Sequence, residues 1–149
     1  MSLRITLLAA ITVLAWPGEA RAQFLALSPM TISFPSSDPD TVPSVAAAPV
    51  QVTYIAFPSG GRPWVISVQA NGHLVSGAAT IDISNVTWTA TPNPPFANGT
   101  LSASVAQTLA TGTNLALFQS GFVTFRLANS WNYSAGTYTQ TITFTLSTP

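Results

Sequence analysis

The segment 136–147 alternates bulky and hydroxylated residues along its length, and this alternation constrains the fold more than any other feature. One set comprises Tyr138, Gln140, Ile142, Phe144 and Leu146, and the other consists of threonines and a final serine. Successive side chains of a β-strand point to opposite faces, so a period of two predicts a half-buried strand. The threonines favour the same extended backbone because branching at Cβ restricts χ1. One wet face also indicates antiparallel pairing, since parallel strands are usually apolar on both faces.

Six further segments show strand-like patterns, and no segment after residue 22 shows a clear helical period. They are Ser28–Phe34, Val50–Phe57, Trp64–Ala70, Thr80–Thr89, Thr100–Leu109 and Phe118–Leu127. About seven short strands without helices predict an all-β fold, an antiparallel two-sheet sandwich of immunoglobulin-like type. A jelly roll is the alternative architecture. Trp64 and Trp88 are predicted to fill the space between the sheets.

Two local features carry more detailed predictions. Asn71-Gly72 is a strong signal for a two-residue β-hairpin. Within Thr80–Thr89 the alternation slips by one residue, which on a regular strand would turn the second half of the buried face toward water. We therefore expect a bulge or bend near Ser84-Asn85.

Residues 1–22 are predicted to be a secretory signal peptide. Arg4 supplies a positive n-region, Ile5–Trp16 is an apolar h-region, and Ala20-Arg21-Ala22 is an A-x-A cleavage motif. The apolar run is shorter than the roughly 20 residues that a bilayer core requires, so no membrane span is predicted. A short leader with this motif is typical of bacteria. We expect a secreted or cell-surface protein whose single sandwich domain covers residues 23–149.

After that cleavage five charged side chains would be left, and this scarcity excludes several functions. They are Arg62, Arg126, Asp38, Asp40 and Asp82. A nucleic-acid binder needs cations that displace counterions from phosphates, so nucleic acid is not an expected partner. The chain has no cysteine, which excludes thiol catalysis, disulfides and Cys-ligated zinc. No cofactor is implied.

Enzymatic activity is not predicted, because catalytic sites depend on titratable side chains. The one imidazole, His73, follows Asn71-Gly72 and is expected to be a solvated turn residue. The three aspartates lie in turn-like or surface positions. Asp38 and Asp40 could lend oxygens to Ca²⁺, which leaves a calcium-stabilised adhesin domain as one alternative.

Aromatic residues in loops support a second alternative, a carbohydrate-binding module. Trp131, Asn132 and Tyr133 share one loop, and Phe96 lies in another. Aromatic rings suit the faces of sugars, and amide groups suit their hydroxyls. The opposing interpretation is that Trp131 and Tyr133 fold back as a lid on the core, which a small domain's need for buried aromatic surface favours.

The ends of the mature chain carry strand-like segments that charged residues do not protect. Uncovered sheet edges recruit other strands, and charges normally discourage this. In the segment Gln23–Phe34, we expect Met30, Ile32 and Phe34 to share one face. This segment either pairs in cis or is donated to another copy, and the sequence favours cis pairing only slightly.

The closing segment Gly136–Leu146 resembles the last strand of bacterial exported sandwiches, among them fimbrial subunits, spore-coat-U-type pilin-like proteins and WxL-type wall-binding domains. Pro63–Ala70 and Ile81–Trp88 are also similar to WxL domains. The chain lacks the disulfide common in the first two families, and it has Trp64-Val65-Ile66 and Trp88-Thr89-Ala90 in place of paired W-x-L motifs. The resemblance implies a structural role in the envelope or outside the cell, and it carries over no binding residue.

These patterns together predict a non-catalytic exported protein with a structural or adhesive role at the bacterial cell surface. The protein is expected to be either a fibre-type, pilin-like subunit or a wall-associated domain. The expected interactions are self-association through edge strands and contact with a wall or glycan surface.

Overall fold

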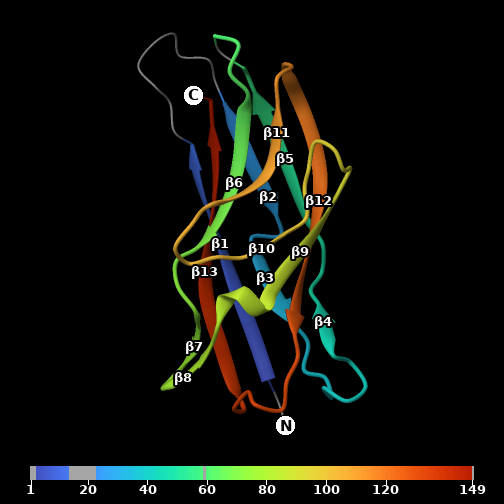
Figure 1. The fold of residues 1–149 in the computed structure, drawn as a ribbon, viewed down its shortest axis with the longest axis vertical. Helices are drawn as coiled ribbons and strands as arrows, with labels where there is room; N and C mark the ends of the chain where they lie inside the picture. The colour runs from blue at the N-terminus through green and yellow to red at the C-terminus, as the bar shows by residue number, and fades with distance from the viewer. Residues whose placement is uncertain (1–2, 14–22, 59, 149) are drawn as a thin grey trace.

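The computed structural model describes residues 3–13, 23–58 and 60–148, which fold into a β-sandwich of two packed sheets (Figure 1). Within these ranges the 3-10 turn η1 (Ile83–Asn85) is the single helical element. The prediction of an all-β, two-sheet sandwich is confirmed.

The strands divide between two sheets, A and B. Sheet A has the order β11-β6-β13-β1-β3, with β7 paired to β13 and β8 paired to β7. Its strands are β1 (Leu3–Val13), β3 (Thr31–Phe34), β6 (Trp64–Ala70), β7 (Leu74–Ser76), β8 (Ala79–Ile81), β11 (Gln107–Gly112) and β13 (Gly136–Ser147). Sheet B has the order β10-β9-β12-β5-β2, with β4 beside β12. Its strands are β2 (Phe24–Ser28), β4 (Ser44–Ala46), β5 (Val50–Ala56), β9 (Val86–Thr91), β10 (Gly99–Thr100) and β12 (Ala116–Ala128).

The strand order corresponds to an immunoglobulin-like sandwich with one unusual member. In sheet B, β2-β5-β12-β9 occupies the places of strands A, B, E and D, and in sheet A, β6-β13-β1 occupies those of C, F and G. A G strand that follows F through a hairpin runs antiparallel to it. Here the strand in the G position comes from the start of the sequence and runs parallel to β13. The predicted antiparallel pairing is therefore wrong for this pair.

Alternating side chains from both sheets fill the core. β5 and β6 bury every second residue, from Val50 to Ala56 and from Trp64 to Ala70, as their sequence patterns predict. The indoles of Trp64 and Trp88 are buried between the sheets, as expected. Each indole Nε1–H donates a hydrogen bond of 2.8 Å to a backbone carbonyl. The acceptor is Asn114 for Trp64 and Ala97 for Trp88. Burying these rings therefore leaves no indole donor unsatisfied.

Three core aromatic rings lie directly on glycines. A Cβ atom added at Gly99 would lie 2.3 Å from the ring of Trp88, and one at Gly112 would lie 2.5 Å from the ring of Trp64. One added at Gly121 would lie 2.3 Å from the ring of Phe96. Real Cβ atoms do not approach carbon so closely, so the three rings occupy space that only a glycine leaves.

The predicted segment Ser28–Phe34 is in fact two strands in different sheets. β2 ends at Ser28 in sheet B, and β3 begins at Thr31 in sheet A. Met30 lies in the bend between them with 47% of its surface exposed, whereas Ile32 and Phe34 are buried. The expectation that Met30 shares their buried face is wrong, because the chain changes sheets at this point.

Similar crossings between sheets explain two other differences. The predicted strand Thr100–Leu109 is replaced by the end of β10 in sheet B and the start of β11 in sheet A. The slip in Thr80–Thr89 is the crossing from β8 in sheet A to β9 in sheet B. The bend expected near Ser84-Asn85 is the 3-10 turn η1.

Asn71-Gly72 does not form the predicted hairpin. The strand that follows it, β7, pairs with β8 and β13 and not with β6. The tight hairpin lies one strand later, where Gly77-Ala78 connects β7 to β8. Gly77 has a φ of 59°, in the left-handed region that glycine adopts without steric cost.

Replacing Gly121 by alanine is expected to destabilise the sandwich by about 2 kcal/mol, because the new methyl group collides with the buried ring of Phe96. Urea unfolding of the full chain measures this change. Gly72→Ala is the matched control, since its Cβ would meet the end of the flexible Gln140 side chain, which can move aside more easily than a buried ring. Equal stability of the two variants would contradict this account of the glycine–aromatic contacts.

Candidate functional site

The most unusual site of the fold is the position between β13 and β3, which we call the strand site. β1 occupies it and pairs in parallel with β13 along all eleven of its residues, from Leu3 beside Gly136 to Val13 beside Leu146. On its other side β1 pairs with β3 in antiparallel fashion, from Ile5 beside Phe34 to Leu8 beside Thr31. Figure 1 shows β1 and β13 side by side along the length of the sandwich.

The side chains of β1 alternate between core and solvent. Ile5, Leu7 and Ala9 are 1%, 0% and 2% exposed, and Ile11 is partly buried against the same core. Leu8 points outward with 55% of its surface exposed. The adjacent leucines Leu7 and Leu8 therefore lie in opposite environments, one in the core and one in solvent, as the period of two requires.

The short strand β3 depends on β1 for its place in sheet A. Among the described strands, β1 is the one that pairs with β3. The backbone N–H of Ala9 also donates 2.9 Å to the carbonyl of Met30, just before β3 begins. Without β1, a gap of two strand spacings, about 9–10 Å, would separate β3 from β13.

The sequence pattern of residues 1–22 predicts a signal peptide and does not predict a strand at this position. The cleavage motif Ala20-Arg21-Ala22 lies outside the described residues, whereas β1 (Leu3–Val13) overlaps most of the predicted h-region. A usable pattern was present, because Ile5, Leu7, Ala9 and Ile11 recur with a period of two. The outward positions between them include Leu8 and Ala10, which hides the alternation.

The residues predicted for strand exchange are used within the chain. Ile32 and Phe34 are buried in β3, next to β1. The segment before them forms β2, which pairs with β5 at the edge of sheet B and buries Leu25 and Leu27. The segment 23–34 therefore contributes to both sheets in cis.

The loop with Trp131 lies at the end of the sandwich where it meets the loop 36–43. Trp131 is 56% exposed, and its indole Nε1–H donates 3.0 Å to a carboxylate oxygen of Asp40. The Asn129 side-chain amide donates 3.0 Å to the carbonyl of Val42 and so ties the two loops together. A shallow recess lies between them, lined by Ser36, Ser37, Pro39, Asn129, Ser130, Trp131 and Tyr133.

The four predicted sugar-contacting residues do not form one site. Tyr133 is partly buried and packs against the core, and this burial raises the pKa of its hydroxyl. Asn132 is exposed beside Trp131. Phe96 is 1% exposed and packs edge-on against Tyr54, with ring centroids 6.0 Å apart. Phe96 is therefore a core residue, and its prediction as a surface contact is wrong because Gly121 leaves room for its ring inside.

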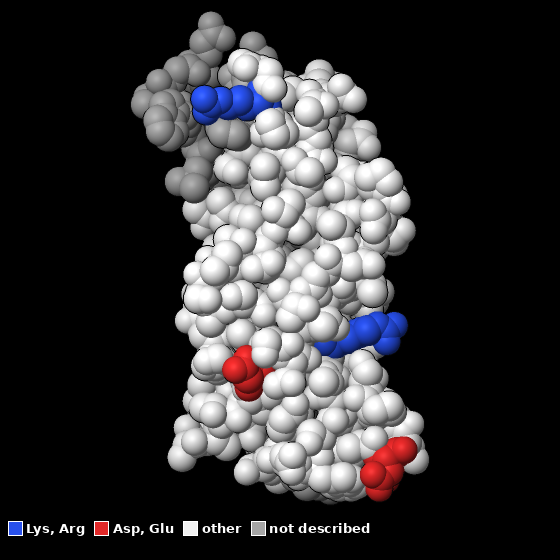
Figure 2. Space-filling view, viewed as in Figure 1, with Lys and Arg blue, Asp and Glu red and all other residues white. Residues whose placement is uncertain are grey.

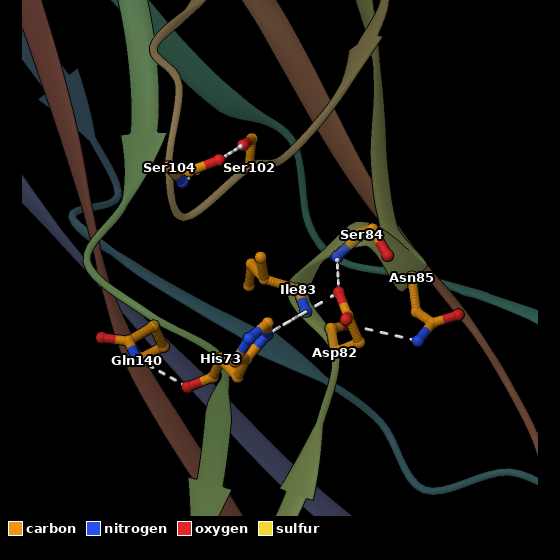
Figure 3. A network of polar contacts seen from close by, with 8 residues as sticks. All are labelled: His73, Asp82, Ile83, Ser84, Asn85, Ser102, Ser104 and Gln140. Carbon is orange, nitrogen blue, oxygen red and sulfur yellow. Dashed lines mark hydrogen bonds and ion pairs between the residues drawn. The ribbon is translucent and has the colours of Figure 1, made fainter.

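A small polar network surrounds His73 and Asp82, which come from the two sides of the β7–β8 hairpin (Figure 3). His73 Nδ1 accepts a hydrogen bond of 3.2 Å from the backbone N–H of Ile83 and lies 3.7 Å from Asp82 Oδ1. Asp82 caps η1, because its Oδ1 accepts a hydrogen bond of 2.8 Å from the backbone N–H of Ser84. Both side chains are more than half exposed, so the contact serves to fix the turn.

The described residues hold no group of three or more His, Cys, Asp or Glu side chains that could bind a metal ion. Asp38 accepts 2.9 Å from the N–H of Asp40 within its own turn, and Asp40 binds the Trp131 indole. Among the described elements there is also no helix of the length and apolarity that crossing a membrane requires.

No protein-family model matches this sequence, and no curated protein matches it either.

The charge of Asp82 is expected to support folding at neutral pH and to stop doing so in acid. Hydrogen bonds from Ser84, followed by the nearby imidazole of His73, lower the pKa of Asp82 below its ordinary value of 3.8. A carboxylate with a lowered pKa in the folded state adds stability above pH 3.8, and this contribution disappears as the pH falls through the lowered pKa.

The comparison that isolates this charge is Asp82→Asn, because asparagine also caps helical turns. Melting curves of both proteins from pH 7 to strongly acidic conditions should show a stability difference at neutral pH that closes in acid. A difference that is the same at every pH would contradict the role of the charge.

Proposed function

We propose that this chain is a non-catalytic, exported structural protein of the bacterial cell surface, a fibre-type subunit whose sandwich is completed by a strand from another polypeptide. The observation that supports the proposal most strongly is the identity of the strand between β13 and β3. That strand, Leu3–Val13, precedes the expected cleavage site near Ala22. A mature chain starting at Gln23 would therefore lack the strand that lies between β3 and β13 in sheet A.

The energetic cost of losing β1 is large compared with the stability of a small domain. Emptying the space of a buried leucine or isoleucine side chain costs about 2–5 kcal/mol. β1 supplies two such side chains, Ile5 and Leu7, together with Ala9 and a ladder along β13. Domains of this size are stable by only about 5–15 kcal/mol. A mature monomer with an empty strand site has little stability left, so a strand donated in trans has a strong driving force.

The surface of the molecule suits assembly rather than charge-driven binding. Figure 2 shows a face that is almost entirely uncharged, with a few isolated basic and acidic groups far apart. Charged side chains on sheet edges normally prevent strand-to-strand association, and this chain has few to place there. The same scarcity supports a non-catalytic role, because acid–base and nucleophilic chemistry use titratable groups.

A second candidate is supported by Trp131. An indole that is 56% exposed and held in place by Asp40 is a suitable platform for a sugar ring, so carbohydrate binding is the alternative function. On this alternative the chain would be a wall-associated or glycan-binding module and the strand site would have no role.

The assembly proposal predicts that purified 23–149 does not exist as a stable folded monomer. Size exclusion with light scattering, together with thermal unfolding, should show polymers or a loosened chain, whereas full-length 1–149 should be a monomer with a cooperative transition. A monodisperse 23–149 that melts as sharply as 1–149 would contradict the proposal.

Substitution of two exposed aromatic residues on different parts of the surface distinguishes carbohydrate binding from a purely structural role. Full-length Trp131→Ala and Phe122→Ala should be retained equally on insoluble wall polysaccharide if the protein is only a structural subunit. Phe122, which is 48% exposed on β12, is the matched control. At least about tenfold weaker retention of Trp131→Ala alone would favour the carbohydrate-binding function; aromatic contacts of hot-spot rank carry losses of this size.

A further inference from the structure

We propose that the leader strand β1 is an intramolecular occupant of the strand site, so that a chain which keeps it is closed to partner strands and a chain which loses it is open. The inference rests on the proposed function and adds to it a switch and a description of the accepted strand. The site takes one strand that runs parallel to β13 and places apolar side chains at alternate positions.

The inward positions of β1 define what the site accepts. Each lies opposite a residue of β13 in the parallel register, and the pairs are Ile5 with Tyr138, Leu7 with Gln140, Ala9 with Ile142, and Ile11 with Phe144. The first three inward side chains are buried, and the fourth packs partly against the same core. The outward positions tolerate exposure, since Leu8 is 55% exposed. Specificity therefore comes from alternate residues, as in other complexes in which a strand adds to a sheet.

The parallel direction excludes the simplest internal source of such a strand. A strand that follows β13 through a tight turn would run antiparallel to it, so a hairpin cannot supply this geometry. A separate segment must supply it, and in this chain that segment is β1.

The start of the mature chain is a poor donor because it is already in use. Leu25 and Leu27 are buried in sheet B, and Ile32 and Phe34 are buried in β3. A copy that donated the segment 23–34 would remove β2 and β3 from its own two sheets in order to fill the strand site of another copy. The open chain is therefore expected to take a strand from a different protein, and the leader is the one segment of its own that fits without such a loss.

Adjacent leucines provide a matched test. A synthetic peptide of residues 3–13 added during refolding of 23–149 should restore a monomer with a cooperative melting transition. The peptide with Leu7→Asp should bind at least about 100-fold more weakly, because it would place an unpaired charge in the core. The peptide with Leu8→Asp, whose changed residue faces solvent, should bind within a fewfold of the unchanged peptide. Equal effects of the two changes, or no restoration by any peptide, would overturn the proposal.

Closure by the leader is tested with the same peptide carrying a fluorophore. It should bind 23–149 and should not bind full-length 1–149, in which β1 already fills the site. Binding to both proteins with similar affinity would overturn the switch.

The direction of the strand is tested by disulfide formation, which the absence of native cysteine makes easy to interpret. In the observed register Thr6 lies beside Thr139 and Thr12 beside Thr145. Peptides with Thr6→Cys or Thr12→Cys should therefore cross-link to 23–149 carrying Thr139→Cys and Thr145→Cys respectively, since neighbouring strands bring Cα atoms within disulfide range. Preferential cross-linking of the opposite pairs would show an antiparallel strand and contradict the proposal.

These experiments separate the inference from the function on which it rests. If the peptide binds as described but 23–149 neither polymerises nor takes a strand from another protein, the strand site stands and the fibre-type function fails. If 23–149 polymerises but ignores the peptide, the function stands and the inference fails.

Discussion

The pairing of β1 with β13 is the interaction on which the rest of sheet A depends. It joins β3 to the sheet, covers one side of the long closing strand, and places Ile5, Leu7 and Ala9 in the core. The remaining strands of the immunoglobulin-like arrangement come from residues 24–147, so this one strand alone belongs to the predicted leader. The stability of the sandwich is thereby linked to a segment that the sequence pattern predicts to be removed.

Among the described residues the core consists of apolar side chains with no buried charged residue, and the chain has no cysteine for a disulfide. Large rings are seated on glycines, and the buried indole groups find backbone acceptors. This leaves a surface with few charges, on which hydroxyl and amide groups lie beside exposed large apolar side chains such as Phe118 and Leu117. Such a surface responds little to changes of salt and pH, but it does little to prevent strand addition. The same scarcity of charge therefore leaves the sheet edges without their usual protection against strand addition.

The sequence predicted those parts of the fold in which burial alternates over many residues. β5, β6, β12 and β13 were placed within about two residues of their ends, as expected for strongly periodic strands. The short strands β4, β7 and β8 carry too few residues for a period to show. β1 was missed for another reason: its outward positions include the apolar residues Leu8 and Ala10, so the segment looks like the continuous apolar run of a signal peptide. Phe96 was misplaced because its burial depends on Gly121, a contact that the order of residues does not reveal.

Amide hydrogen exchange of the full chain, before and after removal of residues 1–22, tests the central claim most directly. The account predicts that removal exposes the amides of β3 and those of β13 that face β1, while the amides of β13 that face β6 lose less protection. Addition of the peptide of residues 3–13 should restore the original pattern. Unchanged protection of β3 and β13 after residues 1–22 are removed would show that residues 23–149 close the sheet by themselves, and it would contradict the account.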